Sequence, residues 1–129
     1  KRKYSGIGNI QLIDPVYDLD VLYVLRNNCR FYIHGHSAGG TNPSLVEAMF
    51  FNCPILAYDV IYNRETTENK AFYFQDAEQL IALLRNDDVL LLEKSARDMS
   101  EIANRRYLWE VVSRQYLEQF DLVSVKADR

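Results

Sequence analysis

The sequence predicts an α/β protein with a Rossmann-like parallel sheet and helices on both of its faces. Strand-like and helix-like segments alternate along the chain, and this alternation favours parallel strands joined by right-handed crossovers. The stretch at 54–60 is almost continuously apolar, as in strands that helices cover on both faces. With 129 residues, of which 48% are hydrophobic, the chain fits one domain with its own core.

The first quarter of the chain is expected to form a strand, a helix and a second strand. The apolar run Ile10–Ile13 is the first strand, closed by Asp14-Pro15 because proline cannot continue a central strand. Asp18 is expected to cap a helix that ends at Asn27-Asn28, and Arg30–His34 is the second strand. One face of this helix is marked by the spacing i, i+3, i+4, i+7 and comprises Leu19, Leu22, Tyr23 and Arg26.

The middle of the chain alternates loops with regular elements. His36–Asn42 is expected to be a loop, followed by a helix that starts at Pro43, is capped by Asn42 and ends near Asn52. Pro54–Val60 is the third strand and Ala71–Phe74 the fourth, with a polar loop at Tyr62–Lys70 between them.

The last part of the chain is predicted to be helical. Asp76 caps one helix, and two further helical patterns precede a tail at 124–129, so that the domain spans 1–123. The inward residues are Leu80, Ile81, Leu83 and Leu84 in the first helix, Val89, Leu92, Ala96, Met99 and Ile102 in the second, and Tyr107, Leu108, Val111, Val112, Tyr116 and Phe120 in the third.

Charge and cysteine content exclude some functions. The net charge of −3 gives no electrostatic reason to bind nucleic acid, and no nucleic-acid partner is expected. No apolar run has the length of a signal peptide or a membrane span, and Lys1–Lys3 is interpreted as a linker or cut end. Cys29 and Cys53 are expected to be reduced and buried, which favours a cytoplasmic protein; a disulfide between them is the alternative.

Ligands of open parallel sheets bind beyond the carboxyl ends of the strands. The loops at Asp14–Tyr17, His36–Asn42 and Asp59–Lys70 should therefore share one rim. One interpretation of this rim is hydrolytic, because residues 35–39 match the G-x-S-x-G nucleophile elbow with Ser37 as nucleophile. Against it, both histidines precede Ser37, and the next helix starts about six residues after it.

The other interpretation is an anion-binding loop. Gly39 and Gly40 allow a tight turn, and the helix that follows directs unpaired amides and its positive dipole end at the loop. A plain strand–helix connection is the alternative. Glu47, one turn inside the helix, could accept hydrogen bonds from ribose hydroxyls or simply be solvated. The expected phosphate donors are the amides of Thr41, Asn42, Ser44 and Leu45 and the hydroxyls of Thr41 and Ser44.

These residues resemble a known family. Asn42-Pro43-Ser44-Leu45-Val46-Glu47-Ala48-Met49, followed by Asn52-Cys53-Pro54-Ile55-Leu56-Ala57, resembles the donor-binding segment of retaining GT-B glycosyltransferases. Ile13-Asp14-Pro15-Val16-Tyr17 is similar to the strand–loop–helix before it, so that the resemblance spans about Ile10 to Leu84. The loop at 35–41 is most similar to that of bacterial rhamnosyltransferase-like enzymes of polysaccharide biosynthesis.

The resemblance implies a set of donor contacts. Glu47 matches the second glutamate of a two-glutamate motif and would bind the ribose, whereas the first glutamate position falls on Gly39. The contact to the transferred sugar that the first glutamate makes in the family is either absent here or supplied by His36 or Ser37. Backbone amides between the two motif positions would hold the diphosphate, and the loop of Pro15 and Val16 would border the nucleobase, on which Tyr17 stacks unless it belongs to the core.

The resemblance also implies what the chain lacks. The substrate would be a nucleoside diphosphate sugar whose glycosyl group is transferred, with retention, to an acceptor hydroxyl. We expect a partial donor domain that needs the N-terminal domain of a longer protein, transfers no sugar alone, and meets a membrane surface only through the full-length protein. The final helix, with Tyr107 and Trp109, would cross to that domain or belong to the core.

No metal cofactor is expected, because GT-B transferases need none. The pair His34-x-His36 is the alternative, since alternate strand positions face one way; otherwise His34 packs in its strand and His36 acts at the loop. Arg64 could pair with a phosphate or have no specific role. The main alternative function is a non-enzymatic flavodoxin-like binding module. Such a module would cluster acidic residues at the end of the first strand, whereas here Asp14 is followed by Pro15 and Asp59 stands alone on its strand.

Overall fold

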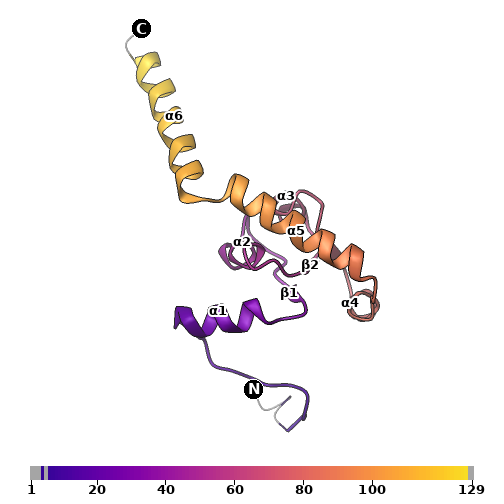
Figure 1. Ribbon diagram of the computed structural model, residues 1–129. Helices are drawn as coiled ribbons and strands as arrows, with labels where there is room; N and C mark the ends of the chain where they lie inside the picture. Colours follow the sequence, from indigo (N-terminus) through magenta and orange to yellow (C-terminus); the bar gives the residue numbers. More distant parts are fainter. Residues whose placement is uncertain (1–3, 5, 128–129) are drawn as a thin grey trace.

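Three short parallel strands form the centre of the protein (Figure 1). The computed structural model describes residues 4 and 6–127, with side chains as far as Phe120. The strands β1 (Tyr32–His34), β2 (Ile55–Tyr58) and β3 (Phe72–Phe74) lie side by side in that order. Because all three are parallel and in register, their carboxyl ends meet at one edge of the sheet. The predicted parallel sheet is confirmed for three of its four expected strands.

The described part of the chain contains six helices, three of which begin at predicted caps. Asp18 accepts hydrogen bonds from the amides of Asp20 and Val21, and Asp76 accepts one from the amide of Gln79. The third predicted cap is Asn42. The helices are α1 (Leu19–Asn27), α2 (Pro43–Met49), α3 (Ile61–Thr66), α4 (Ala77–Leu84), α5 (Val89–Arg106) and α6 (Trp109–Ala127).

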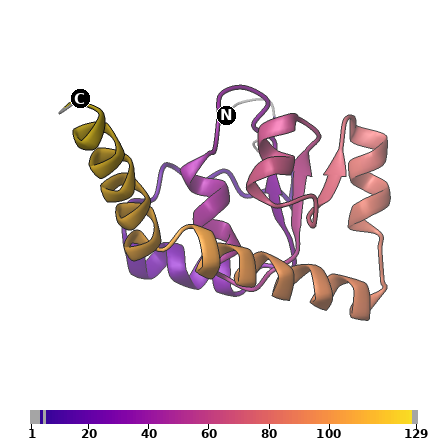
Figure 2. The ribbon, with the colours of Figure 1, turned by 90° about the horizontal axis from the view of Figure 1, so that it is seen from above.

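The hydrophobic core lies on one face of the sheet. Alternation along β2 directs Ile55 and Ala57 to this face, where α2 and α5 cover them. Figure 2 shows α5 running along one side of the sheet and α4 beside β3. Ile33 points to the opposite face and stays largely exposed. The fully buried side chains from the two covering helices are Leu45, Ala48, Met49, Met99, Ile102 and Ala103.

The predicted strand at Ile10–Ile13 is wrong. This segment has no regular structure and its apolar side chains are exposed. In Figure 1 the chain before α1 lies on the far side of α1 from the sheet. A strand needs a neighbour for its backbone amides and carbonyls, and none of the strands in the described part of the chain pairs with this segment.

The predicted polar loop at Tyr62–Lys70 is also wrong over its first half, which is helix α3. Polar side chains face inward here. Asn63, Thr66 and Thr67 are buried, and both threonine hydroxyls donate to carbonyls four residues earlier in the chain. A helix whose buried side is polar leaves no hydrophobic periodicity for the sequence to show.

Two helices differ in detail from expectation. Helix α2 ends at Met49, with Phe50 as its C-cap, rather than near Asn52, and Asn52 itself takes up a left-handed backbone conformation with φ of 49°. In α4 no side chain is fully buried; Leu80 and Leu83 are half-buried, whereas Ile81 and Leu84 are exposed. The inward face predicted for α4 is therefore only half correct.

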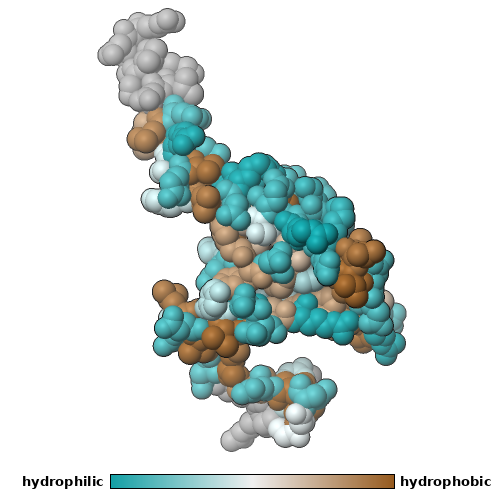
Figure 3. Space-filling view, viewed as in Figure 1, coloured by the Kyte–Doolittle hydropathy of each residue, from teal (hydrophilic) through white to brown (hydrophobic). Residues whose placement is uncertain are grey.

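Helix α6 projects from the rest of the protein (Figure 1), and apolar surface runs along it and over α1 (Figure 3). Leu108, Tyr116 and Phe120 are exposed, so their assignment to the inward face is wrong, whereas Tyr107 packs against the core before the helix begins. Trp109 is also exposed, so the core alternative for this residue is wrong. Backbone helix continues through 124–127, in the segment expected as a tail, and 128–129 lie outside the described residues. Among the helices of this part of the chain, none combines the length and hydrophobicity that crossing a membrane requires.

Candidate functional site at the carboxyl edge of the sheet

Two of the three predicted loops meet at the carboxyl edge of the sheet. The side-chain amide of Asn63, which is 1% exposed, donates to the carbonyl of His36 at 3.0 Å and to that of Tyr58 at 2.8 Å. These two hydrogen bonds fasten the loop after β1 to the end of β2. The predicted shared rim is thereby confirmed for His36–Asn42 and Asp59–Lys70.

The third loop is not part of this rim. Asp14–Tyr17 belongs to the segment that lies beyond α1, and the side chain of Tyr17 is 86% exposed. Tyr17 is therefore not a core residue. Pro15 and Val16, expected beside a nucleobase, belong to the segment before α1, which Figure 1 shows on the far side of α1 from the sheet.

Gly39 sets the conformation of the loop after β1. Its φ of 96° lies in a region that side chains with a Cβ rarely adopt. A Cβ atom at this position would fit without a clash, since within 4 Å it would meet only His36 Nε2, at an ordinary contact distance of 3.8 Å. A glutamate at this position would therefore be strained by the backbone, which agrees with the absence of one here.

The amides that open α2 are partly occupied by the protein itself. Asn42 Oδ1 accepts from the Ser44 amide at 2.9 Å, and the Asn42 carbonyl accepts from the Leu45 amide at 3.0 Å. Two of the four expected amide donors are thus engaged within the helix cap. In the described part of the chain, the amides of Thr41 and Asn42 carry no such bond, and the hydroxyls of Thr41 and Ser44 belong to exposed residues.

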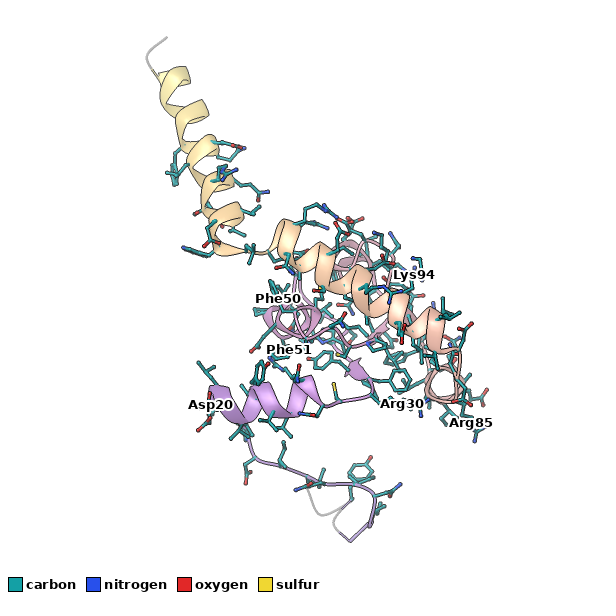
Figure 4. All side chains as sticks on the ribbon, in the orientation of Figure 1. Asp20, Arg30, Phe50, Phe51, Arg85 and Lys94 are labelled. Atoms are coloured by element: carbon teal, nitrogen blue, oxygen red, sulfur yellow. The ribbon has the colours of Figure 1, made fainter. Side chains whose placement is uncertain are left out.

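Glu47 is held by an arginine that the sequence analysis did not select. The Glu47 carboxylate forms an ion pair with Arg26 of α1, whose guanidinium also lies over the ring of Phe51, 5.9 Å from its centroid. The Glu47 side chain remains 47% exposed. Figure 4 shows Phe51 between α1 and α2. The sequence did carry a signal for this pair, because Arg26 shares its predicted helix face with Leu19, Leu22 and Tyr23. Of these three apolar side chains only Leu22 is half-buried, whereas Leu19 and Tyr23 are exposed.

The two histidines stand at the end of β1. His34 is 5% exposed, and its Nε2 has no hydrogen-bond partner among the described residues. Burial, and then the neighbouring His36, lower the pKa of His34, so its imidazole is neutral at pH 7. Its ring stacks on Tyr32 and lies 5.9 Å from the ring of His36. The prediction that His34 packs in its strand is confirmed.

The described residues bring no three potential metal ligands together from histidine, cysteine, aspartate and glutamate. The pair His34 and His36 therefore has no third ligand of these types in that part of the chain. Zinc sites in proteins use at least three such side chains.

Arg64 is paired with Asp59 on the same edge. Its Nε lies 2.5 Å from Asp59 Oδ1 and its Nη2 2.9 Å from Oδ2, while the guanidinium covers the ring of Tyr73 at 4.1 Å. The hydrogen bond from Arg64 holds the pKa of Asp59 below its usual value. Asp59 is therefore an ionised structural partner, and Arg64 is engaged with it rather than directed at a ligand.

The arrangement around Ser37 does not fit a nucleophile elbow. Helix α2 begins at Pro43, as predicted, whereas an elbow requires the helix to start at the serine. Both histidines precede Ser37 along the chain. The G-x-S-x-G match is therefore a coincidence of sequence within a longer loop.

These features define the protein as a mixed α/β protein with a small three-stranded parallel sheet, an arrangement compatible with a Rossmann-like fold. Comparison with known proteins found no family model and no curated protein that matches the chain.

Proposed function

We propose that this chain is the donor-binding part of a glycosyltransferase of polysaccharide biosynthesis, which binds a nucleoside diphosphate sugar beside β1. The observation that carries the proposal is the exposed loop His36–Asn42 at the carboxyl end of β1, which leads directly into α2 with Glu47 one turn further on. Ligands of open parallel sheets bind at this edge. The resemblance to rhamnosyltransferase-like enzymes gives the same residues the same role.

The diphosphate would lie against the start of α2. Because Asn42 already occupies the amides of Ser44 and Leu45, the remaining donors are the amides of Thr41 and Asn42 and the nearby hydroxyls. The positive end of the helix dipole adds to the attraction, although α2 has only 7 residues. His36 lies on the same loop and would provide the contact to the sugar that Gly39 lacks.

The ribose would lie against Glu47. A carboxylate has about four lone-pair sites, so its ion pair with Arg26 leaves acceptors for two ribose hydroxyls. Arg26 is only 14% exposed and fixes the carboxylate from one side. Glu47 therefore orients the nucleotide and does not react.

The chain's contribution to transfer would be electrostatic. As the bond between sugar and diphosphate breaks, negative charge develops on the departing diphosphate, and fixed amide and hydroxyl donors stabilise it. The acceptor site and any reacting group would come from the N-terminal domain of the intact enzyme. We assign no catalytic residue and no metal to this chain.

Calorimetric titration with uridine and thymidine diphosphates tests the proposal. Wild-type protein should bind at least one of them more tightly than it binds pyrophosphate or the free nucleoside. Glu47→Gln should weaken the binding about tenfold, the equivalent of one charge-assisted hydrogen bond.

Glu93→Gln is the matched control, because Glu93 also pairs with an arginine but lies on α5. It should leave nucleotide affinity unchanged. Failure of wild-type protein to bind either diphosphate, or equal affinity in Glu47→Gln and wild type, would contradict the proposal.

A further inference from the structure

Two cysteines lie together at the amino ends of neighbouring strands. Cys29 stands three residues before β1, and Cys53 stands two residues before β2. The strands are adjacent and in register, and the amide of Tyr32 donates to the carbonyl of Pro54 at 3.0 Å. Adjacent strands lie about 4.8 Å apart, within the range of about 4.4–6.8 Å that disulfides span between Cα atoms.

The two thiols are close enough to influence each other, because the neighbouring Cys29 adds to the rise in the pKa of Cys53. The Cys29 thiol donates to the carbonyl of Arg26, 3.1 Å away. Both cysteines are free.

Their exposure differs, which gives the two thiols different roles. Cys53 is 5% exposed, whereas Cys29 is only half-buried. A dissolved oxidant would therefore reach Cys29 first, and Cys53 would be reached only by Cys29. Burial, reinforced by the neighbouring Cys29, raises the pKa of the Cys53 thiol to about 12, so Cys53 is the slower nucleophile of the pair.

We propose that Cys29 and Cys53 form a reversible disulfide when the folded chain meets a low-molecular-weight disulfide such as oxidised glutathione. The Cys29 thiolate attacks the glutathione disulfide, forms a mixed disulfide and releases one glutathione thiolate. The Cys53 thiolate then attacks the Cys29 sulfur and releases the second glutathione. Two protein thiols are oxidised, and one oxidised glutathione is reduced to two glutathione molecules.

The cross-link would join the end of α1 to the start of β2. The closed loop contains β1, the candidate site loop and α2, and it restricts the unfolded chain more than the folded one. The Cys29 proton that now bonds to the Arg26 carbonyl is lost on oxidation. Because the cross-link restricts the unfolded chain, oxidised protein should have a higher Tm than reduced protein.

Mass spectrometry of the intact folded chain tests the proposal. The chain is equilibrated with reduced and oxidised glutathione, and its remaining thiols are then alkylated with N-ethylmaleimide. We expect a species that has lost two hydrogens and carries no alkyl group, with a peptide joining residues 29 and 53, and we expect dithiothreitol to reverse it. Retention of two alkylatable thiols, a lasting glutathione adduct, or disulfide-linked dimers would overturn the proposal.

Two variants assign the roles. Cys53→Ser should stop at the glutathione adduct on Cys29, and Cys29→Ser should form neither an adduct nor a disulfide, because Cys53 is buried. Cys29→Ser changes the more exposed side chain, so it keeps the test decisive where Cys53→Ser does not fold. A glutathione adduct on Cys53 in Cys29→Ser would overturn the order of attack.

Discussion

The side-chain amide of Asn63 donates a 3.0 Å hydrogen bond to the backbone carbonyl of His36, 27 positions earlier in the chain. The same amide donates to the carbonyl of Tyr58. One buried side chain thus joins α3, the end of β2 and the loop that forms the candidate site. The geometry of that loop depends on a residue outside it.

Asn63→Asp should destabilise the protein by about 2–4 kcal/mol, because the variant replaces a donor with a carboxylate that faces two carbonyls. The loss should appear as a lower midpoint in urea denaturation with an unchanged slope. Asn104→Ala is the control, since the Asn104 side chain is exposed and bonds only within α5. It should change stability by no more than about 0.5 kcal/mol. Equal stability of the two variants would show that Asn63 does not fasten the loop.

Much of the fold follows from local rules that the sequence displays. Asp18, Asn42 and Asp76 begin helices because a short polar side chain there accepts from amides that the helix leaves unpaired. The parallel order of β1, β2 and β3 follows from the intervening helical segments. These signals depend only on residues close together in the chain.

Features that depend on distant residues could not be predicted in this way. Ile10–Ile13 has the composition of a strand but no neighbouring strand to pair with. Helix α3 buries Asn63 and Thr66, so hydrophobic periodicity does not reveal it. In both cases the deciding contact lies outside the segment whose pattern was interpreted.

The candidate site shows a conflict that the sequence already contained. Asn42 was expected as the helix cap while the Ser44 amide was expected as a phosphate donor. An N-cap side chain accepts from the second or third helical amide, so both expectations cannot hold at once. In the structure Asn42 caps the helix, because its Oδ1 accepts a hydrogen bond from the Ser44 amide.

Gly39 and Gly40 are adjacent glycines that should respond differently to the same substitution. Gly39→Ala forces a Cβ into a backbone conformation with φ of 96°, which should cost about 1–2 kcal/mol of stability. Gly40 has no such φ and nothing within 4 Å of an added Cβ, so Gly40→Ala should be tolerated. Thermal unfolding of both variants makes the comparison. A larger loss of Tm in Gly40→Ala would contradict the loop conformation.

His34 should make the stability of the protein depend on pH below neutrality. In the unfolded chain its imidazole titrates near the ordinary value of 6.5, whereas burial lowers the pKa in the folded protein. Just below pH 6.5 the unfolded chain therefore binds a proton that the folded chain does not. This proton binding lowers the free energy of the unfolded state relative to the folded state. The stability that neutral His34 provides is complete above about pH 6.5 and falls as the pH approaches the lowered folded pKa.

The measurement is the urea midpoint at about pH 7.5 and about pH 5.5, on either side of the ordinary histidine pKa. Wild-type protein should lose stability between the two, and His34→Phe should lose less, because phenylalanine keeps the ring against Tyr32 without a titratable group. His36→Phe is the control and should retain the His34-dependent loss, since His34 remains buried. If His34→Phe and wild type lost stability in parallel on acidification, His34 would not be the buried neutral histidine that the structure shows.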